Sequence, residues 1–298
     1  MKKFFPFFFL FVVMRNSTAM QNSEIPALQL LKECAHMAIP EKLLLERYAT
    51  LNEHGYIFYI TSPIAQHFID DSETHKRFLE IGSGFSQTTE KCLRKGIGEY
   101  TANDLSLEHL KILSALLQKA FANQTETHLN KLKLLPGRIP DVLTPKENYY
   151  DGILMDKVLH FFTPQDSEKF LAWAHKALKP NGKLYIFTLS PFNTGHDNMA
   201  ALYQQQKLKT DFYPGYVENV KPYMRISDAT NPNYAVPNNR LFFMLEDLKK
   251  LLESKNFTIR KTFTTRLPRE ETPFWVESEE EQCDLVGIIA QKPEHSLT

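Results

Sequence analysis

The chain has 298 residues, 43% of them hydrophobic, which suits one large domain with additions or two modest domains and indicates a folded core rather than a disordered chain. Lysine plus arginine equals aspartate plus glutamate at 35 each, so there is no net charge to attract DNA or RNA over a long distance, and no nucleic-acid partner is expected. Cys34, Cys92 and Cys283 lie far apart without the CxxC spacing of a zinc site, so we expect reduced thiols and no metal.

Residues 1–22 have the layout of a secretory signal peptide. Two lysines precede an apolar run at 4–14, and small residues follow it. The run is too short to span a bilayer as a helix, so no stable membrane anchor is expected. This interpretation predicts a secreted protein, whereas a translation start at Met14 or Met20 predicts a cytoplasmic one.

Residues 23–75 are predicted to form a helical extension ahead of the main domain. Apolar residues recur at helical spacing as far as Pro40, and a second helical pattern covers 41–51. Residues 56–60 suggest a short strand, and 64–69 suggest a further helical turn.

Strands and helices alternate in the next part of the chain. The predicted strands cover 77–81, 99–103, 131–135, 152–155 and 183–188, and the predicted helices cover 86–95, 107–121 and 164–177. Alternation of elements of this size predicts an α/β fold, with a mostly parallel sheet covered by helices on both faces.

After residue 191 the pattern lapses over a segment rich in tyrosine, proline and asparagine. A loop that long inside a compact domain is uncommon, so we predict an inserted cap at 192–243 with a helix at 199–208. The remaining predicted elements are a helix at 245–254 and strands at 258–264 and 285–291. They complete a domain at 76–292 with seven strands in its sheet, followed by a tail at 293–298.

Two glycines mark a candidate ligand site. Residues 78–86 read FLEIGSGFS, which places Gly82 and Gly84 at a strand end directly before a helix. Glycine there permits a tight turn and close approach of a ligand, and the helix N-terminus offers N–H groups to an anion, although an ordinary strand-to-helix turn is the alternative. Asp104 ends the next strand, where an acid can accept hydrogen bonds from ribose hydroxyls, although it could also serve only as a helix N-cap.

These residues resemble the first motifs of the class I S-adenosylmethionine-dependent methyltransferases. Glu80, Gly82, Gly84 and Asp104 match the acid, the glycine turn and the acid of the second strand, whereas Ser86 stands where many members have a third glycine. The resemblance implies a Rossmann-like fold in which the glycines line the methionine part of the cofactor. It also implies that Glu80 helps to hold the amino group and that Asp104 holds the ribose.

A second block strengthens the resemblance. Residues 150–162 read YDGILMDKVLHFF and resemble the family's fourth strand with its VLHH-type tail, and 177–186 read ALKPNGKLYI and resemble its LKPGG turn and fifth strand. Asn181 replaces a glycine there, and asparagine also tolerates positive φ. Nucleotide-dependent dehydrogenases share the glycine turn, but this block fits the methyltransferases better.

One position departs from the family pattern. After the third strand, where many members place an aspartate against the adenine, this chain has Gly137 and Arg138, so we expect a backbone contact near them. The implied cofactor-binding residues are Glu80, Gly82, Ser83, Gly84, Asp104, Leu105, Gly137, Arg138 and Asp156.

Methyl transfer from a sulfonium mainly requires alignment of the reactants and exclusion of water. Asp156 and His160 follow the fourth strand at the ligand-binding edge of the sheet and are the candidate catalytic residues, with a solvated acid and a packed structural histidine as the alternatives. The aromatic cap at 192–243 suits a lid over the acceptor, although it could also only bury sheet surface. The sequence therefore predicts a methyltransferase acting on an oxygen or nitrogen atom of a small molecule. A protein or peptide side-chain methyltransferase and a nonenzymatic module that keeps the fold are the alternatives.

Overall fold

The computed structural model describes most of the chain from residue 56 onward and a few short stretches before it. The described residues are 24–27, 29, 34, 42–43, 47–50, 56–73, 75–122, 125–142, 146–210, 213–225, 238–269, 272, 274–278 and 282–294. The predicted leader at 1–22 lies outside them. Within the described part, no helix combines the length and apolar character that a membrane crossing requires.

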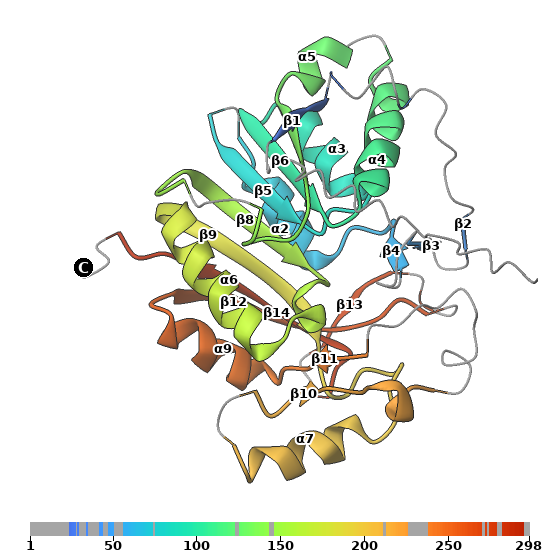
Figure 1. The fold of residues 1–298 in the computed structure, drawn as a ribbon, viewed down its shortest axis with the longest axis vertical. Coiled ribbons are helices and arrows are strands. Elements are labelled where there is room, and N and C mark those ends of the chain that lie inside the picture. Colours follow the sequence, from blue (N-terminus) through green and yellow to red (C-terminus); the bar gives the residue numbers. More distant parts are fainter. Residues whose placement is uncertain are drawn as a thin grey trace, which may run out of the picture.

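A twisted sheet forms the centre of the molecule, in the order β1-β7-β6-β5-β8-β9-β14-β12-β13 (Figure 1). Its long strands are β5 (Arg77–Ile81), β6 (Glu99–Asp104), β7 (Leu132–Pro136), β8 (Tyr150–Asp156), β9 (Leu178–Leu189), β12 (Thr258–Arg266) and β14 (Leu285–Gln291). Strands β7, β6, β5, β8 and β9 pair in parallel, and β14 runs antiparallel between β9 and β12. The predicted α/β class is therefore confirmed.

The predicted number of seven strands is too low, because two short strands extend the sheet at its edges. Strand β1 (Ile25–Pro26) pairs antiparallel with β7, and β13 (Val276–Glu277) pairs antiparallel with β12. Strand β9 also begins earlier than the predicted 183–188, at Leu178. Asn181 has φ of 64°, the positive value expected from its place in the turn.

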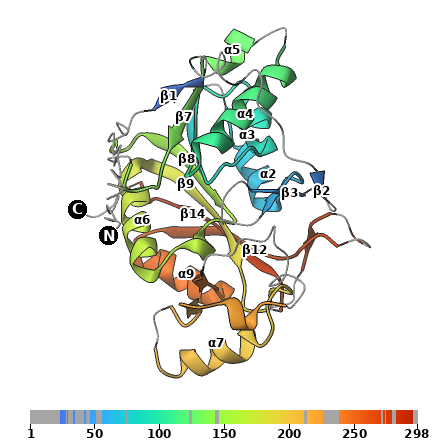
Figure 2. The ribbon, with the colours of Figure 1, turned by 45° about the vertical axis from the view of Figure 1, so that its right-hand side comes forward.

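Helices cover both faces of the sheet. They are α2 (Pro63–Asp70), α3 (Gln87–Arg94), α4 (Leu107–Ala120), α5 (Thr125–Leu129), α6 (Pro164–Ala177) and α9 (Leu245–Ser254). Figure 2 shows α2, α3 and α4 on one side and α6 and α9 on the other, and the buried side chains form one apolar cluster on each side. Strand β8 is buried from both faces, which explains why its residues 153–155 read as an apolar run rather than as an alternating pattern.

The N-terminal extension departs from its prediction. The described residues of the predicted helix at 41–51 form strands β2 (Lys42–Leu43) and β3 (Arg47–Ala49), which join β4 (Tyr56–Phe58) in a small antiparallel sheet. The Tyr48 ring packs edge-on against Phe85, 5.9 Å between centroids, and tertiary contacts of this kind outweigh local helix propensity. Strand β4 agrees with the predicted strand. Much of the first predicted helix, including Leu28 and Leu31, lies outside the described residues.

The described residues of 192–243 form a small unit below the sheet in Figure 1. It contains α7 (Met199–Lys207), which agrees with the predicted helix, and strands β10 (Tyr216–Val217) and β11 (Arg240–Leu241). Its own apolar cluster contains Met199, Tyr203, Val217, Val220, Met224 and Phe242. This cluster shows that the cap is a packed unit rather than a loop.

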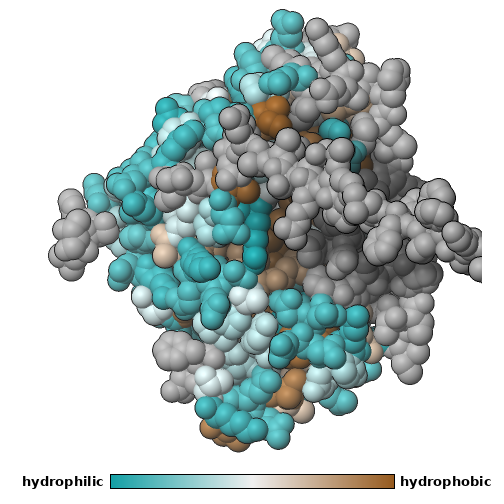
Figure 3. Space-filling model, viewed as in Figure 1, coloured by the Kyte–Doolittle hydropathy of each residue, from teal (hydrophilic) through white to brown (hydrophobic). Residues whose placement is uncertain are grey.

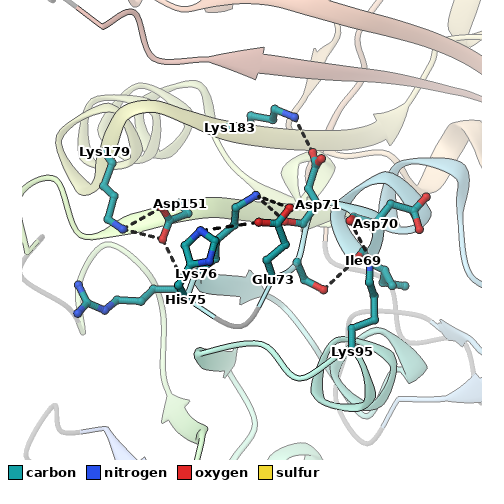
Figure 4. A network of polar contacts seen from close by, with 12 residues as sticks. Ile69, Asp70, Asp71, Glu73, His75, Lys76, Lys95, Asp151, Lys179 and Lys183 are labelled. Atoms are coloured by element: carbon teal, nitrogen blue, oxygen red, sulfur yellow. Dashed lines mark hydrogen bonds and ion pairs between the residues drawn. The ribbon is translucent and has the colours of Figure 1, made fainter.

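Charged side chains tie the end of α2 to β9, and β9 to β8 (Figure 4). The Asp71 carboxylate accepts hydrogen bonds from Lys183 Nζ at 2.7 Å and from the Tyr185 hydroxyl, both on β9. Burial raises the pKa of Asp71, but these hydrogen bonds outweigh burial and hold it below its ordinary value. Asp151 on β8 binds Lys179 of β9 at 2.7 Å. These contacts fix β8 and β9 at one end of the sheet. The candidate site lies at the other end of β8.

Candidate active site

A cavity of about 470 Å³ lies at the carboxyl ends of β5, β6, β7 and β8. This volume is in the range of small-molecule sites, and this edge is where open α/β sheets bind ligands. The strand ends and the loops after them contribute Glu80, Ile81, Gly82, Ser83, Gly84, Ser86, Asn103, Asp104, Leu105, Gly137, Arg138, Ile139, Asp156, Lys157 and Val158. In the space-filling view of Figure 3, the surface of the described residues is mostly hydrophilic. Apolar surface gathers in a hollow near the middle of the view.

The structure brings all nine sequence-predicted cofactor residues to this one cavity. Gly82 and Gly84 have φ of 64° and 53°, the left-handed region that favours glycine. A Cβ atom on Gly82 would lie 2.5 Å from Val158 Cγ2. Ser86 has φ of −69°, which any residue adopts, so the absence of a third glycine places no strain on this turn.

Asp104 is buried at the end of β6, and its side chain organises the glycine turn. One carboxylate oxygen accepts the Gly84 N–H at 2.8 Å, and the other accepts the Ser106 N–H at 2.8 Å and contacts His109 Nδ1 at 3.0 Å. A carboxylate offers about four acceptor positions, so roughly one stays open for a ligand hydroxyl while His109 is in place. The sequence analysis missed His109, although it lies five residues after Asp104 in the first turn of α4.

Glu80 is a buried carboxylate, with an exposed fraction of 4%. Its two oxygens accept hydrogen bonds from Tyr100 at 2.6 Å, Ser86 at 2.9 Å and Thr89 at 3.0 Å. Burial raises the pKa of Glu80 from 4.5 to about 7, although these hydrogen bonds favour the ionised form. Ser86, which stands in place of the family's third glycine, therefore donates a hydrogen bond to this carboxylate.

The loop after β7 is held by the protein itself. The Gly137 N–H donates to the Asp104 carbonyl at 2.8 Å, and its carbonyl accepts from Asn103 Nδ2 at 2.8 Å. Arg138 Nη2 pairs with Asp166 of α6 at 2.5 Å. Both backbone groups of Gly137 thus help to hold this loop in place, and Gly137 forms part of the cavity wall.

Asp156 lies at the end of β8 with both carboxylate oxygens engaged. One accepts the Ser62 hydroxyl at 2.9 Å, and the other pairs with Lys157 Nζ at 2.5 Å. The alternative of a solvated loop acid does not hold, because the side chain is only 16% exposed. Ser62 also caps α2 by accepting the Ala65 N–H, so it links the N-terminal region to the cavity.

His160 does not reach the cavity. It is 6% exposed, packs against the Phe161 ring with 4.1 Å between centroids, and does not line the cavity. The short 3₁₀ turn at Leu159–Phe161 directs Phe161 toward the cavity and His160 into the packed interior. The structure therefore favours the packed structural histidine over the catalytic assignment.

The described residues of the cap do not form the lid that its aromatic residues predicted. None of its described residues lines the cavity. The Tyr203 and Tyr213 hydroxyls instead donate to Asp247 of α9 and Glu168 of α6, at 2.5 and 2.6 Å. These contacts hold the cap against the helices. Its apolar side chains pack in its own core and against the core of the main sheet.

The N-terminal segment covers the cavity in place of the cap. It contributes Thr50, Tyr56, Ile57, Phe58 and Ile60 to the lining. Ile57 Cδ1 would lie 2.5 Å from a Cβ atom on Gly84, so the segment lies directly over the glycine turn. Trp275 holds it there by donating from Nε1 to the Ile60 carbonyl at 3.3 Å.

Comparison with known proteins agrees with this architecture. A family model described as a methyltransferase domain matches residues 79–186, which contain the glycine turn, Asp104 and the fourth and fifth strands of the parallel sheet. The chain carries a class I S-adenosylmethionine-dependent methyltransferase domain. S-adenosylmethionine is accordingly its cofactor.

Solved structures share the fold of this methyltransferase. An S-adenosylmethionine-dependent methyltransferase from Methanosarcina mazei is 18% identical with a TM-score of 0.51, and the match covers 79% of this chain and 100% of that one. One from Mesorhizobium loti is 15% identical with a TM-score of 0.53, and the match covers 76% and 96%. No curated protein matches the sequence.

The proposed contact between Glu80 and the cofactor's amino group predicts a pH-dependent affinity. Only the ionised carboxylate attracts an ammonium, and its pKa of about 7 leaves it largely protonated at lower pH in the free methyltransferase. We expect affinity for S-adenosylhomocysteine, measured by calorimetry, to rise up to about pH 7 and then level off, with proton release on binding below that pH.

Glu80→Gln is the matched variant, because it keeps the size of the side chain and removes the titration. We expect weaker binding at pH 8 and a flat pH profile. Stability changes in the opposite direction to affinity. The free protein binds this proton more tightly than the unfolded chain does, so this group lowers the free energy of unfolding as pH rises from about 4.5 to about 7. An unchanged pH profile in Glu80→Gln would contradict the assigned contact.

Proposed function

We propose that this methyltransferase transfers the methyl group of S-adenosylmethionine to an oxygen or nitrogen atom of a small molecule. The observation that carries this proposal is that the N-terminal segment covers the cavity. Tyr56, Ile57 and Phe58 line it, and Ile57 lies over the glycine turn. A covered cavity suits a small acceptor better than a protein side chain presented on a large surface. The zero net charge also offers no attraction to a nucleic acid.

The residues of the cavity suit the cofactor. The glycine turn leaves room for close approach, the buried Glu80 carboxylate suits an ammonium, and Asp104 keeps acceptor capacity for a ribose hydroxyl. We assign Ser83 and Leu105 to the same ligand because they line the cavity beside these groups, and Leu105 is exposed to 52%. Bound there, the sulfonium supplies an activated methyl group with a neutral thioether as leaving group.

The protein's own contribution is alignment and exclusion of water. The N-terminal segment excludes solvent from the end of the cavity that β8 forms, where Asp156 and Lys157 lie. Ser62 and Lys157 hold the Asp156 carboxylate in one orientation. In this position Asp156 orients a polar group of the acceptor, and water can take the proton that an oxygen or nitrogen acceptor loses.

A transfer assay tests the proposal. The purified chain is incubated with methyl-labelled S-adenosylmethionine and a cell extract separated into metabolites and proteins. We expect label in a small-molecule product whose mass is larger by one methyl group, and no product with the Asp104→Ala variant. Label in the protein fraction alone would favour a protein methyltransferase, and cofactor binding without any transfer would favour a nonenzymatic module.

A further inference from the structure

Lys157 borders the cavity, and its contact with Asp156 is the one role that the proposed function gives it. It follows β8 directly, with φ of 58° and its N–H bonded to the Phe187 carbonyl at 2.7 Å. A left-handed backbone is uncommon outside glycine, asparagine and aspartate, so this conformation is held by its surroundings. It places the lysine side chain in the cavity wall, where it is 17% exposed.

The ammonium of Lys157 lies among aromatic rings. Its Nζ atom is 5.2 Å from the centre of the Trp275 ring and 5.8 Å from those of Phe58 and Phe187. Cation–π attraction at these distances stabilises a charged group that has lost much of its water. The rings therefore keep the lysine extended and charged at the edge of the cavity.

The hydrogen-bonding capacity of this ammonium is only partly used. It has three N–H donors, and within the described part of the chain Asp156 is its hydrogen-bond partner. The other cation of the cavity wall, Arg138, is paired with Asp166 at the N-terminus of α6. Lys157 is thus the cation best placed to donate hydrogen bonds to a molecule in the cavity.

The cavity that this donor borders also has aromatic walls. Phe58, Phe161 and Phe162 line the same cavity. A ring lying against them and an anionic oxygen directed at Lys157 would together satisfy the apolar walls and the open donors. A cationic acceptor would offer no oxygen to these open N–H donors.

On the basis of the proposed methyl transfer, we propose that Lys157 determines acceptor specificity by binding an anionic oxygen, so that the acceptors are small aromatic acids. Charge-assisted hydrogen bonds of this kind contribute about 1.5–3 kcal/mol, which corresponds to roughly ten- to hundredfold in affinity.

The test uses three probes of similar size that differ in charge: benzoate, benzamide and benzylamine. Each is titrated by calorimetry into the full chain saturated with S-adenosylhomocysteine. We expect benzoate to bind at least about tenfold more tightly than the other two. Lys157→Met should abolish this preference, Lys157→Arg should keep it, and Lys249→Met, which removes the same charge from the surface helix α9, should leave it unchanged.

Two readouts separate this inference from the proposed function. S-adenosylhomocysteine affinity is measured for every variant, and failure of the wild-type chain to bind it would contradict the cofactor site itself. If the cofactor binds, four results would overturn the role of Lys157 alone. These are tighter binding of benzylamine, equal binding of all three probes, no binding of any probe, and a benzoate preference that survives in Lys157→Met.

Discussion

Replacing Asp104 with alanine is expected to weaken S-adenosylhomocysteine binding by at least about tenfold. The substitution removes the acceptor for the Gly84 N–H, together with the partner of Ser106 and His109. It also removes the one remaining acceptor position assigned to a ribose hydroxyl. Since hydrogen bonds to charged groups contribute about 1.5–3 kcal/mol each, the loss of even one accounts for the expected effect. Isothermal titration calorimetry measures it directly.

A matched control separates the loss of the ligand contact from damage to the fold. Asp151→Ala also removes a charged, hydrogen-bonded carboxylate from a strand of the same sheet, but from the opposite end of it, where Asp151 binds Lys179. We expect this variant to lose stability without losing cofactor affinity. An Asp104→Ala protein that melts as a folded domain and binds within about threefold of the wild type would refute the ribose contact.

The second large effect is expected for Gly82→Ala. Its φ of 64° costs an alanine about 1–2 kcal/mol, and the new methyl group would lie 2.5 Å from Val158 Cγ2. The turn must therefore shift in the wall of the cavity, and we expect cofactor binding to weaken by at least about tenfold. Calorimetry measures the affinity, and denaturant unfolding measures the stability.

Two further variants identify the cause of the Gly82→Ala effect. Gly96→Ala carries similar backbone strain, with φ of 83°, but lies before β6 at the other end of the sheet, so it should lose stability and keep cofactor affinity. Val158→Ala combined with Gly82→Ala removes the clash and should restore part of the binding. If the double variant binds no better than Gly82→Ala alone, the steric explanation is wrong and backbone strain is the sole cause.

The location of the lid changes where acceptor specificity should be sought. The aromatic residues at 192–243 predicted a lid over the acceptor, but Tyr203 and Tyr213 of this segment bind α9 and α6. Thr50 and residues from 56–60 cover the cavity instead, held by Trp275 of the segment between β12 and β14. Variation in these two segments is therefore expected to alter the acceptor more than variation in the cap.

The sequence alone was sufficient for the parallel sheet and for nine of the residues that line the cavity. Strand and helix periods are local patterns, and the carboxyl ends of parallel strands must meet at one edge. For that reason Gly82, Asp104 and Asp156, which are far apart in the chain, could be predicted to gather at one site. The positive φ of Asn181 was also readable, because it depends on the residue and its turn.

Only the tertiary structure decided which segments complete that site. Helix propensity favoured a helix at 41–51, but contacts such as Tyr48 with Phe85 stabilise strands there. The direction of His160 into the interior, the engagement of Asp104 by His109, and the position of Lys157 among Phe58 and Trp275 likewise depend on partners distant in sequence. Such contacts form only when separate elements pack together, so local sequence patterns do not predict them. The hydrophobic periodicity that specifies each element, by contrast, lies in consecutive residues.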